Sequence, residues 1–302
     1  MPTIAITGAT GTLGRPLIGA LLGRGDSVIA LVRDPARAAL PATVELRRWT
    51  ATDPIAPLAD ADAVINLVGT PIAPHPWTAT RLREIITSRI NGTRSVVAGI
   101  AQAKGNIKVL LSASAIEYSG ERGDAGFDET TPGGTGLLSE LTQAWEREAV
   151  QAQGDGARVV LLRKGVVLSP QGGMLKTVLP WFRAGLGMTL GDGRQWLPWL
   201  HVADDIGLML LALDHAAVVG PLICAAPEPV RFREFSRILG QVVQRPAWLP
   251  MPAWALRLAL GEMAQTVLAS HRPRVDWALE LGYRFRFPTL EPALQDLVGS
   301  RD

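Results

Sequence analysis

The chain has 302 residues, of which 47% are hydrophobic and 19% are charged, and its formal net charge is +2. This composition is typical of a compact protein with a sizeable core, and it excludes a disordered chain and argues against a nucleic acid partner. The single cysteine, Cys224, excludes an intramolecular disulfide and a cysteine-cluster metal site.

The first fourteen residues predict a phosphate-binding turn. A short apolar strand over residues 3–6 runs into three glycines spaced three apart, and an amphipathic helix is predicted over residues 13–24. In a strand–turn–helix unit such glycines let main-chain N–H groups approach a pyrophosphate. We therefore expect a dinucleotide cofactor at Thr7, Gly8, Thr10, Gly11, Thr12, Leu13 and Gly14. No basic leader with an apolar core precedes the strand, so we expect a cytoplasmic location.

The end of the second strand, residues 28–32, indicates which dinucleotide binds. An NAD site usually places an acid there for the adenosine ribose, whereas an NADP site supplies a cation for the 2′-phosphate. Here Arg33 follows Val32 directly, and Asp34-Pro35 is typical of a turn that starts a helix. The sequence favours NADP(H), with Arg33 as the phosphate ligand.

The next segments continue the alternation of strands and helices. A short helix is expected over residues 35–40 and a third strand near residues 44–49, with Asp53 beyond it to meet the adenine amino group. Residues 63–69 form a continuous apolar strand, whose end at Leu67-Val68-Gly69 is expected to contact the cofactor. This alternation predicts an α/β fold with a doubly wound parallel Rossmann sheet.

A hydroxyl cluster follows the long helix predicted over residues 77–103. The apolar strand over residues 109–111 leads into Ser112-Ala-Ser114 and then Glu117-Tyr118. Ligands of open α/β sheets bind at the carboxyl ends of strands, so we assign Ser112 to the cofactor and Ser114 to the substrate. A solvated strand exit is the alternative interpretation.

These blocks resemble a known family. The glycine turn, the strand ending at Gly69 and the serine-rich strand end look like an extended short-chain dehydrogenase/reductase of the NAD(P)-dependent epimerase/dehydratase group. The blocks 112–118, 191–196, 199–205 and 245–252 resemble, more narrowly, an epimerase family sometimes labelled as a cell-division-inhibitor homologue. The resemblance implies that Ser114 is the catalytic serine. It also suggests a possible homodimer through helices 77–103 and 137–151.

The resemblance also implies a Tyr-x-x-x-Lys pair on the helix 137–151, which this chain lacks. Its two tyrosines are Tyr118 and Tyr283, and the positions of the pair hold Leu141 and Trp145. Either another group transfers the proton, or no redox chemistry on a carbonyl occurs. For the first case the candidates are Tyr118, with Arg122 four residues on as its cation, and Glu117 as an acid or base. A solvated loop acid is the alternative for Glu117.

The second half predicts the covering region. After a sixth strand over residues 159–162, Lys164 either contacts a ligand or is an ordinary surface lysine. Glycine-rich turns carry aromatic residues that we expect to wall an apolar pocket, namely Trp181, Phe182, Trp196 and Trp199.

Asp204 or Asp205 is expected to cap a helix and to fix the fold rather than to bind a metal, because no further His or Cys lies nearby. Residues 249–268 are interrupted by prolines and charges, which favours a helix covering a pocket over association with a membrane.

We therefore predict an NADP-binding Rossmann domain over residues 1–168, to which residues 200–226 return with the last strand. Residues 169–199 and 227–302 form a smaller C-terminal substrate-covering region. The predicted function is an NADP-dependent oxidoreductase or epimerase-like enzyme acting on a small, partly apolar substrate. The alternative is a cofactor-binding regulatory protein without turnover, for example one linked to cell division.

Overall fold

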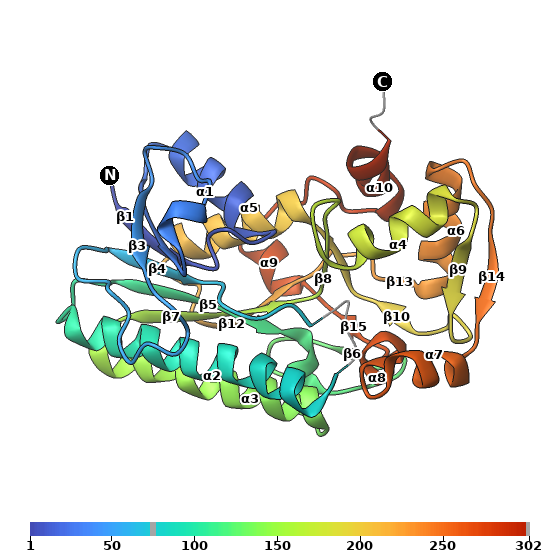
Figure 1. Cartoon of the computed structure of the whole chain (residues 1–302), viewed down its shortest axis with the longest axis horizontal. Coiled ribbons are helices and arrows are strands. Elements are labelled where there is room, and N and C mark those ends of the chain that lie inside the picture. The colour runs from blue at the N-terminus through green and yellow to red at the C-terminus, as the bar shows by residue number, and fades with distance from the viewer. Residues whose placement is uncertain (73–76, 300–302) are drawn as a thin grey trace.

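The fold is described by a computed structural model that covers residues 1–72 and 77–299 (Figure 1). Seven parallel strands form the central sheet in the order β12-β7-β5-β4-β1-β2-β3, which confirms the predicted doubly wound sheet. Their bounds are β1 Thr3–Thr7, β2 Ser27–Val32, β3 Glu45–Arg48, β4 Ala63–Asn66, β5 Val109–Ala115, β7 Arg158–Lys164 and β12 Gly220–Cys224. The predicted return of the last strand is confirmed, because β12 pairs in parallel with β7.

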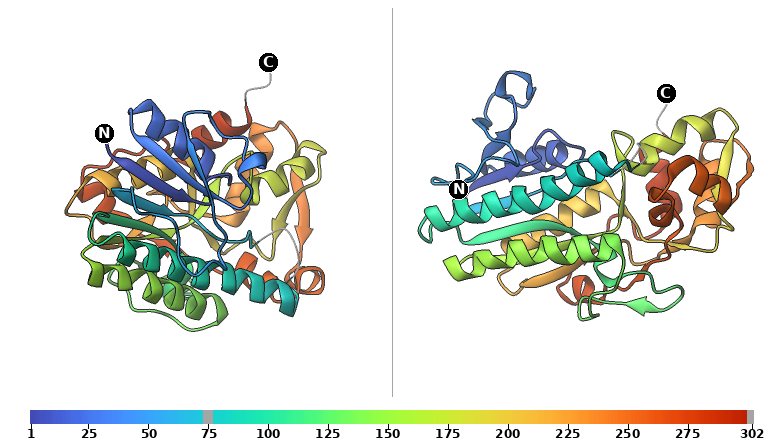
Figure 2. Two further views of the ribbon diagram at one scale, coloured as in Figure 1. Left: turned by 60° about the vertical axis from the view of Figure 1, so that its left-hand side comes forward. Right: turned by 60° about the horizontal axis from the view of Figure 1, so that its bottom comes forward.

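Helices cover both faces of this sheet, as continuous apolar strands require. On one face lie α1 (Gly14–Gly23) and α5 (Val202–Asp214). On the other face α2 (Ala79–Gln102) and α3 (Leu137–Val150) lie side by side (Figure 2). Each face has its own buried cluster, so the sheet is enclosed by two hydrophobic layers. Short 3-10 helices lie in the connections, namely η1 (Pro35–Arg37), η2 (Ile116–Ser119) and η3 (Gln151–Asp155).

A smaller lobe lies beyond the carboxyl ends of the strands, and it has a hydrophobic core of its own. Its helices are α4 Gly173–Arg183, α6 Phe232–Val242, α7 Ala253–Leu260, α8 Met263–Leu268 and α10 Leu290–Val298. Its short strands pair as β8 (Val166–Leu168) with β11 (Trp199–His201), β9 (Gly187–Leu190) with β14 (Ala247–Met251), and β10 (Trp196–Leu197) with β13 (Val230–Arg231). A further pair, β6 (Gly126–Phe127) and β15 (Arg272–Pro273), joins the lobes.

The two lobes are tied together at the start of α5. The buried carboxylate of Asp204 accepts hydrogen bonds from the N–H groups of Arg286 (2.7 Å) and Phe287 (2.9 Å) and from the hydroxyl of Tyr283 (3.1 Å). The prediction that Asp204 or Asp205 caps α5 was wrong, because Nδ1 of His201 accepts from the N–H of Ala203 (3.0 Å). The expected fold-fixing role holds for Asp204, which ties the segment after α9 (Asp276–Glu280) to the start of α5.

The predicted tryptophan walls were also wrong. Trp199 and Phe182 are fully buried in the core of the smaller lobe. Trp196 lies between two arginines, with guanidinium carbons 4.0 Å (Arg231) and 4.7 Å (Arg272) from its ring. Trp181 is exposed, whereas the other three aromatic side chains pack within the protein and help to hold this lobe together. Among the described residues, no helix is long and apolar enough to cross a membrane.

Candidate active site

The glycine turn between β1 and α1 has the geometry of an anion-binding site. Gly8 has φ +66°, and a Cβ there would lie 2.6 Å from the carbonyl oxygen of Leu67. A Cβ at Gly14 would lie 2.4 Å from the carbonyl oxygen of Gly8, so strand, turn and helix meet too closely for side chains. No side chain caps the N-terminus of α1, and its first turn carries no acid. Its N–H groups and its positive dipole end are therefore available to a phosphate.

Two residues predicted to contact the cofactor, Thr7 and Ser112, have side chains that support this turn from beneath. Thr7 and Ser112 are fully buried, and both contact Asn66 at the end of β4. The Thr7 hydroxyl donates to Oδ1 of Asn66 (2.7 Å) and accepts from the N–H of Val68 (3.0 Å). The side-chain amide of Asn66 points to the hydroxyls of Ser112 (3.4 Å) and Thr93 (2.9 Å). Because their side chains face the interior, Thr7 and Ser112 align the strand ends.

The residues after β2 divide into a cap and an exposed cation. The Asp34 carboxylate accepts from the N–H of Ala36 (3.1 Å) and caps η1, as the sequence predicted. Arg33 is exposed and, among the described residues, makes no hydrogen bond or ion pair. Asp53 is half-buried, and its carboxylate accepts from the N–H (2.8 Å) and hydroxyl (3.0 Å) of Thr50. The adenine contact of Asp53 stays a prediction.

A cavity of about 270 Å³ lies at the carboxyl ends of β4, β5 and β7. Its charged side chains are Arg89, Glu117 and Lys164, while most of the other lining residues are apolar. The alternative of an ordinary surface lysine was wrong for Lys164, because its side chain is 9% exposed and its Nζ lies 2.5 Å from Oδ1 of buried Asp205. The lining residues are Leu67, Val68, Gly69, Ile72, Arg89, Ala113, Ser114, Ala115, Ile116, Glu117, Leu138, Leu141, Thr142, Trp145, Lys164, Gly165 and Val166.

A second cavity, of about 470 Å³, adjoins the first and shares Glu117 and Leu138 with it. Its far wall comes from the smaller lobe, from Glu262 through α8 to His271. Glu117 therefore stands where the two cavities meet. A small molecule bound in the second cavity would have one end beside the charged groups of the first.

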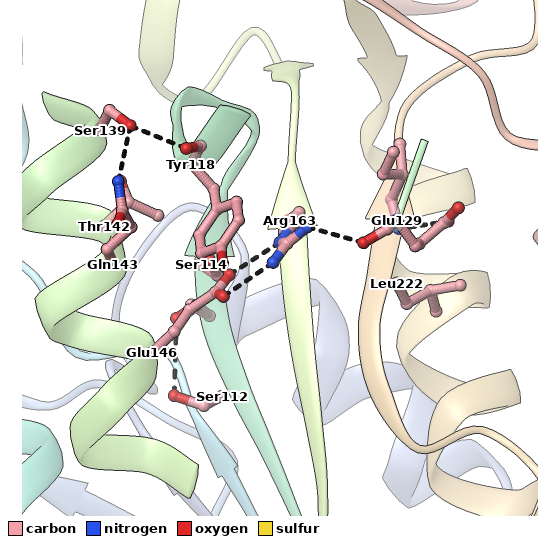
Figure 3. A network of polar contacts seen from close by, with 12 residues as sticks. Ser112, Ser114, Tyr118, Glu129, Ser139, Thr142, Gln143, Glu146, Arg163 and Leu222 are labelled. Carbon is pink, nitrogen blue, oxygen red and sulfur yellow. Dashed lines mark hydrogen bonds and ion pairs between the residues drawn. The ribbon is translucent and has the colours of Figure 1, made fainter. Parts of the chain in front are cut away.

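Ser114 lines the first cavity, but its hydroxyl is held from behind by a buried ion pair (Figure 3). It donates to Oε1 of Glu146 on α3 at 2.5 Å. The two carboxylate oxygens of Glu146 accept from Nε (2.9 Å) and Nη2 (3.0 Å) of Arg163 on β7. The third nitrogen of Arg163 donates to the carbonyl oxygen of Glu129 (3.1 Å). This network fixes the serine hydroxyl against α3.

Tyr118 lies on the other side of that ion pair. The guanidinium carbon of Arg163 is 3.5 Å from the centre of the Tyr118 ring, and both residues line a separate cavity of about 590 Å³. The structure does not bring Tyr118 to the cavity that Ser114 and Glu117 share. Its predicted cation, Arg122, donates instead to the carbonyl oxygens of Ser119 and Pro132. Arg122 is therefore not the cationic partner of the Tyr118 hydroxyl, despite the matching spacing.

Comparison with known proteins identifies the family. The model of the NAD dependent epimerase/dehydratase family matches residues 4–223, and that of a domain of unknown function, DUF1731, matches residues 251–297. The chain belongs to the NAD dependent epimerase/dehydratase family. This confirms the resemblance inferred from the sequence blocks.

Several epimerase family proteins are similar to this family member over nearly their whole length. Epimerase family protein Mb2239 of Mycobacterium bovis is 38% identical, with 96% of each chain covered. YfhF of Bacillus subtilis is 35% identical, with 99% of this chain and 98% of the relative covered. The crystal structure of human SDR39U1 with NADPH has a TM-score of 0.90 at 29% identity, covering 99% of this chain and 100% of that one.

One cavity residue of this epimerase/dehydratase family member escaped the sequence reasoning. Arg89 lies on α2, four residues after Ile85 and seven before Val96, in line with the buried stripe of that helix. A charged residue in this stripe could have marked Arg89 as a candidate site residue, because an amphipathic helix normally has apolar residues there. The structure brings its guanidinium to the cavity, beside Trp145.

Proposed function

We propose that this family member is an NADP(H)-dependent oxidoreductase or epimerase-like enzyme for a small, partly apolar substrate. The observation that carries the proposal is the cavity at the ends of β4, β5 and β7, where a carboxylate and two cations lie among apolar walls. Such a combination in a largely apolar cavity is typical of catalysis. The cofactor, when bound, supplies or accepts a hydride at its nicotinamide ring.

The glycine turn fits such a dinucleotide. A Cβ at exposed Gly11 would approach the carbonyl oxygen of Gly8 at 3.1 Å and no other described atom within 4 Å, so this face of the turn is open. The phosphates would lie against the uncapped N-terminus of α1. Exposed Arg33 supports the choice of NADP(H), because its guanidinium suits a 2′-phosphate and Asp34 is already engaged as a cap. The NADPH named with human SDR39U1 agrees with this choice.

Glu117 is the group we propose for proton transfer. Among the described residues that line the cavity it is the one carboxylate, and it stands where the substrate-side cavity begins. Ser114 would position the substrate oxygen, and Lys164, whose ammonium is paired with Asp205, would donate a hydrogen bond beside it. Tyr118 is the weaker candidate, because it lines the cavity on the far side of Arg163. The apolar walls favour a ligand with apolar carbon next to the reacting group.

Stopped-flow absorbance of bound NADPH tests the proposal against a panel of aldehydes, ketones and quinones. We expect at least one class to oxidise bound NADPH, with Glu117→Gln slowing that step and Glu84→Gln, on exposed α2 surface, leaving it unchanged. Tight NADPH binding without oxidation by any compound would contradict turnover. That result would favour the alternative of a cofactor-binding regulatory protein.

A further inference from the structure

Arg89 of α2 and Trp145 of α3 both line the cavity and lie against each other. The guanidinium carbon lies 5.3 Å from the centre of the Trp145 ring, a cation–π distance. Trp145 occupies the sequence position at which the family pattern has its lysine, and its indole N–H donates to Thr93 on α2 (2.8 Å). The tryptophan therefore provides a fixed platform on α3 for a cation that comes from α2.

The guanidinium of Arg89 is held through its Nη1 nitrogen. Its Nη1 donates to the carbonyl oxygens of Thr70 (3.0 Å) and Ile85 (3.2 Å). Within residues 1–72 and 77–299, its Nη2 donates to no acceptor. Since Arg89 lines the cavity, Nη2 is a donor that a ligand in the cavity could use, on a guanidinium that the backbone holds in place.

Close packing brings α2 and this guanidinium to the end of β4. A Cβ at Gly92 would lie 2.8 Å from Cγ1 of Val68, so a larger residue there would push the helix away. A Cβ at Gly69 would lie 3.3 Å from the guanidinium carbon of Arg89. Arg89 thus rests against the backbone just after β4, next to the strand that carries the glycine turn.

Arg89 keeps its positive charge although it is largely buried. Burial lowers the pKa of Arg89 to about 10, and the nearby Glu117 carboxylate opposes that effect. Arg89 therefore remains a cation at neutral pH, facing the acid proposed for proton transfer. The other cation of the cavity, Lys164, is already paired with Asp205.

We infer that Arg89 binds the ribose of the nicotinamide half of the dinucleotide and so supplies from α2 the cation that α3 lacks. The inference rests on the proposed function. A dinucleotide whose phosphates lie at the glycine turn after β1 must cross the end of β4 to reach the cavity beside β5, and Gly69 and Arg89 lie on that path. Ribose hydroxyls accept hydrogen bonds from a guanidinium, whose planar donors are preorganised.

Calorimetric titration of two ligands tests the inference. NADPH contains both halves of the dinucleotide, whereas adenosine 2′,5′-bisphosphate contains the adenosine half alone. We expect Arg89→Met to weaken NADPH by about tenfold to a hundredfold and to leave the bisphosphate unchanged. Arg89→Lys keeps the charge and should recover part of the loss. Arg83→Met, at an exposed position of the same helix, is the matched control and should bind both ligands as the unaltered protein does.

The outcomes separate the two proposals. If the unaltered protein binds neither ligand, both the proposed function and this inference fail. If it binds both, and Arg89→Met binds NADPH unchanged, the inference alone is overturned. Equal losses for the two ligands in both Arg89→Met and Arg89→Lys would also overturn it, because the effect would then reach the adenosine half.

Discussion

The Ser114 hydroxyl donates a hydrogen bond to Oε1 of Glu146 at 2.5 Å, and both carboxylate oxygens of Glu146 are in turn bound by Arg163 (Figure 3). A hydroxyl has one proton to donate, so the Ser114 oxygen can then only accept. The serine expected to orient the substrate therefore suits a substrate hydroxyl better than a carbonyl. The ion pair decides this preference without touching the substrate.

Glu146→Gln should strongly destabilise the protein. The Arg163 side chain is 5% exposed, and removing the charge of its partner leaves a buried, uncompensated guanidinium. Breaking such a pair costs about 3–5 kcal/mol. Urea unfolding should register this loss, and Glu146→Gln combined with Arg163→Met should regain much of it. Glu148→Gln, which removes the exposed pair with Arg94, is the control and should cost less than about 1 kcal/mol. Equal effects of Glu146→Gln and Glu148→Gln would contradict a structural role for the buried pair.

Arg33→Ala should weaken NADPH by about tenfold or more while leaving NADH nearly unchanged, since only NADPH carries the 2′-phosphate for a charge-assisted hydrogen bond. Fluorescence titration with both nucleotides measures this. Arg37→Ala serves as the control, because Arg37 is also exposed but pairs with Asp34. An equal loss for both nucleotides would show that Arg33 does not select the cofactor.

Glu117→Gln should lower turnover by about a hundredfold or more and leave NADPH affinity within about twofold, since the carboxylate is expected to act on the substrate rather than to hold the phosphates. Single-turnover absorbance and equilibrium titration on the same preparation separate the two effects. Tyr118→Phe is the informative comparison. If Tyr118→Phe loses as much turnover as Glu117→Gln, proton transfer would have to involve the separate cavity that Tyr118 and Arg163 line.

Cys224 should make the fold less stable in alkali. Burial raises the pKa of this fully buried thiol to about 12, from the ordinary value of 9.0. Between these pH values the thiol is deprotonated in the unfolded chain but stays protonated in the folded chain. The contribution of Cys224 to the free energy of unfolding is therefore complete below pH ~9, and above that pH it falls by about 1.4 kcal/mol per pH unit. The stability difference between the unaltered protein and Cys224→Ala, measured by urea unfolding at pH 8, 9 and 10, should shrink accordingly. A stability difference that stays constant with pH would show that the pKa of Cys224 is not raised.

Much of the fold could be predicted because its signals are local. The glycine turn, the apolar strands and the amphipathic helices each repeat within a few residues, and the structure reproduces them with small shifts at their ends. The helix expected over residues 137–151, for example, is α3 from Leu137 to Val150. Asp34 was predicted as a cap for the same reason, since a cap and its helix are neighbours in sequence.

The site was harder to predict because its members come from distant segments. Arg89 and Trp145 are 56 residues apart in sequence, and only the packing of α2 on α3 joins them. Tyr118 illustrates the reverse error. It follows Ser114 by four residues, but η2 turns the chain so that its ring lies on Arg163. Spacing in a loop does not fix direction, whereas spacing in a helix or strand does.

The contacts of Asp204 lie apart from the second cavity. Three hydrogen bonds on this buried carboxylate hold the segment between α9 and α10 to the start of α5. The far wall of the second cavity is α8, so a ligand that enters this cavity need not break those bonds. Changes at Gln265 or Thr266, which line the second cavity, should therefore alter which molecules are admitted without loosening the contact at Asp204.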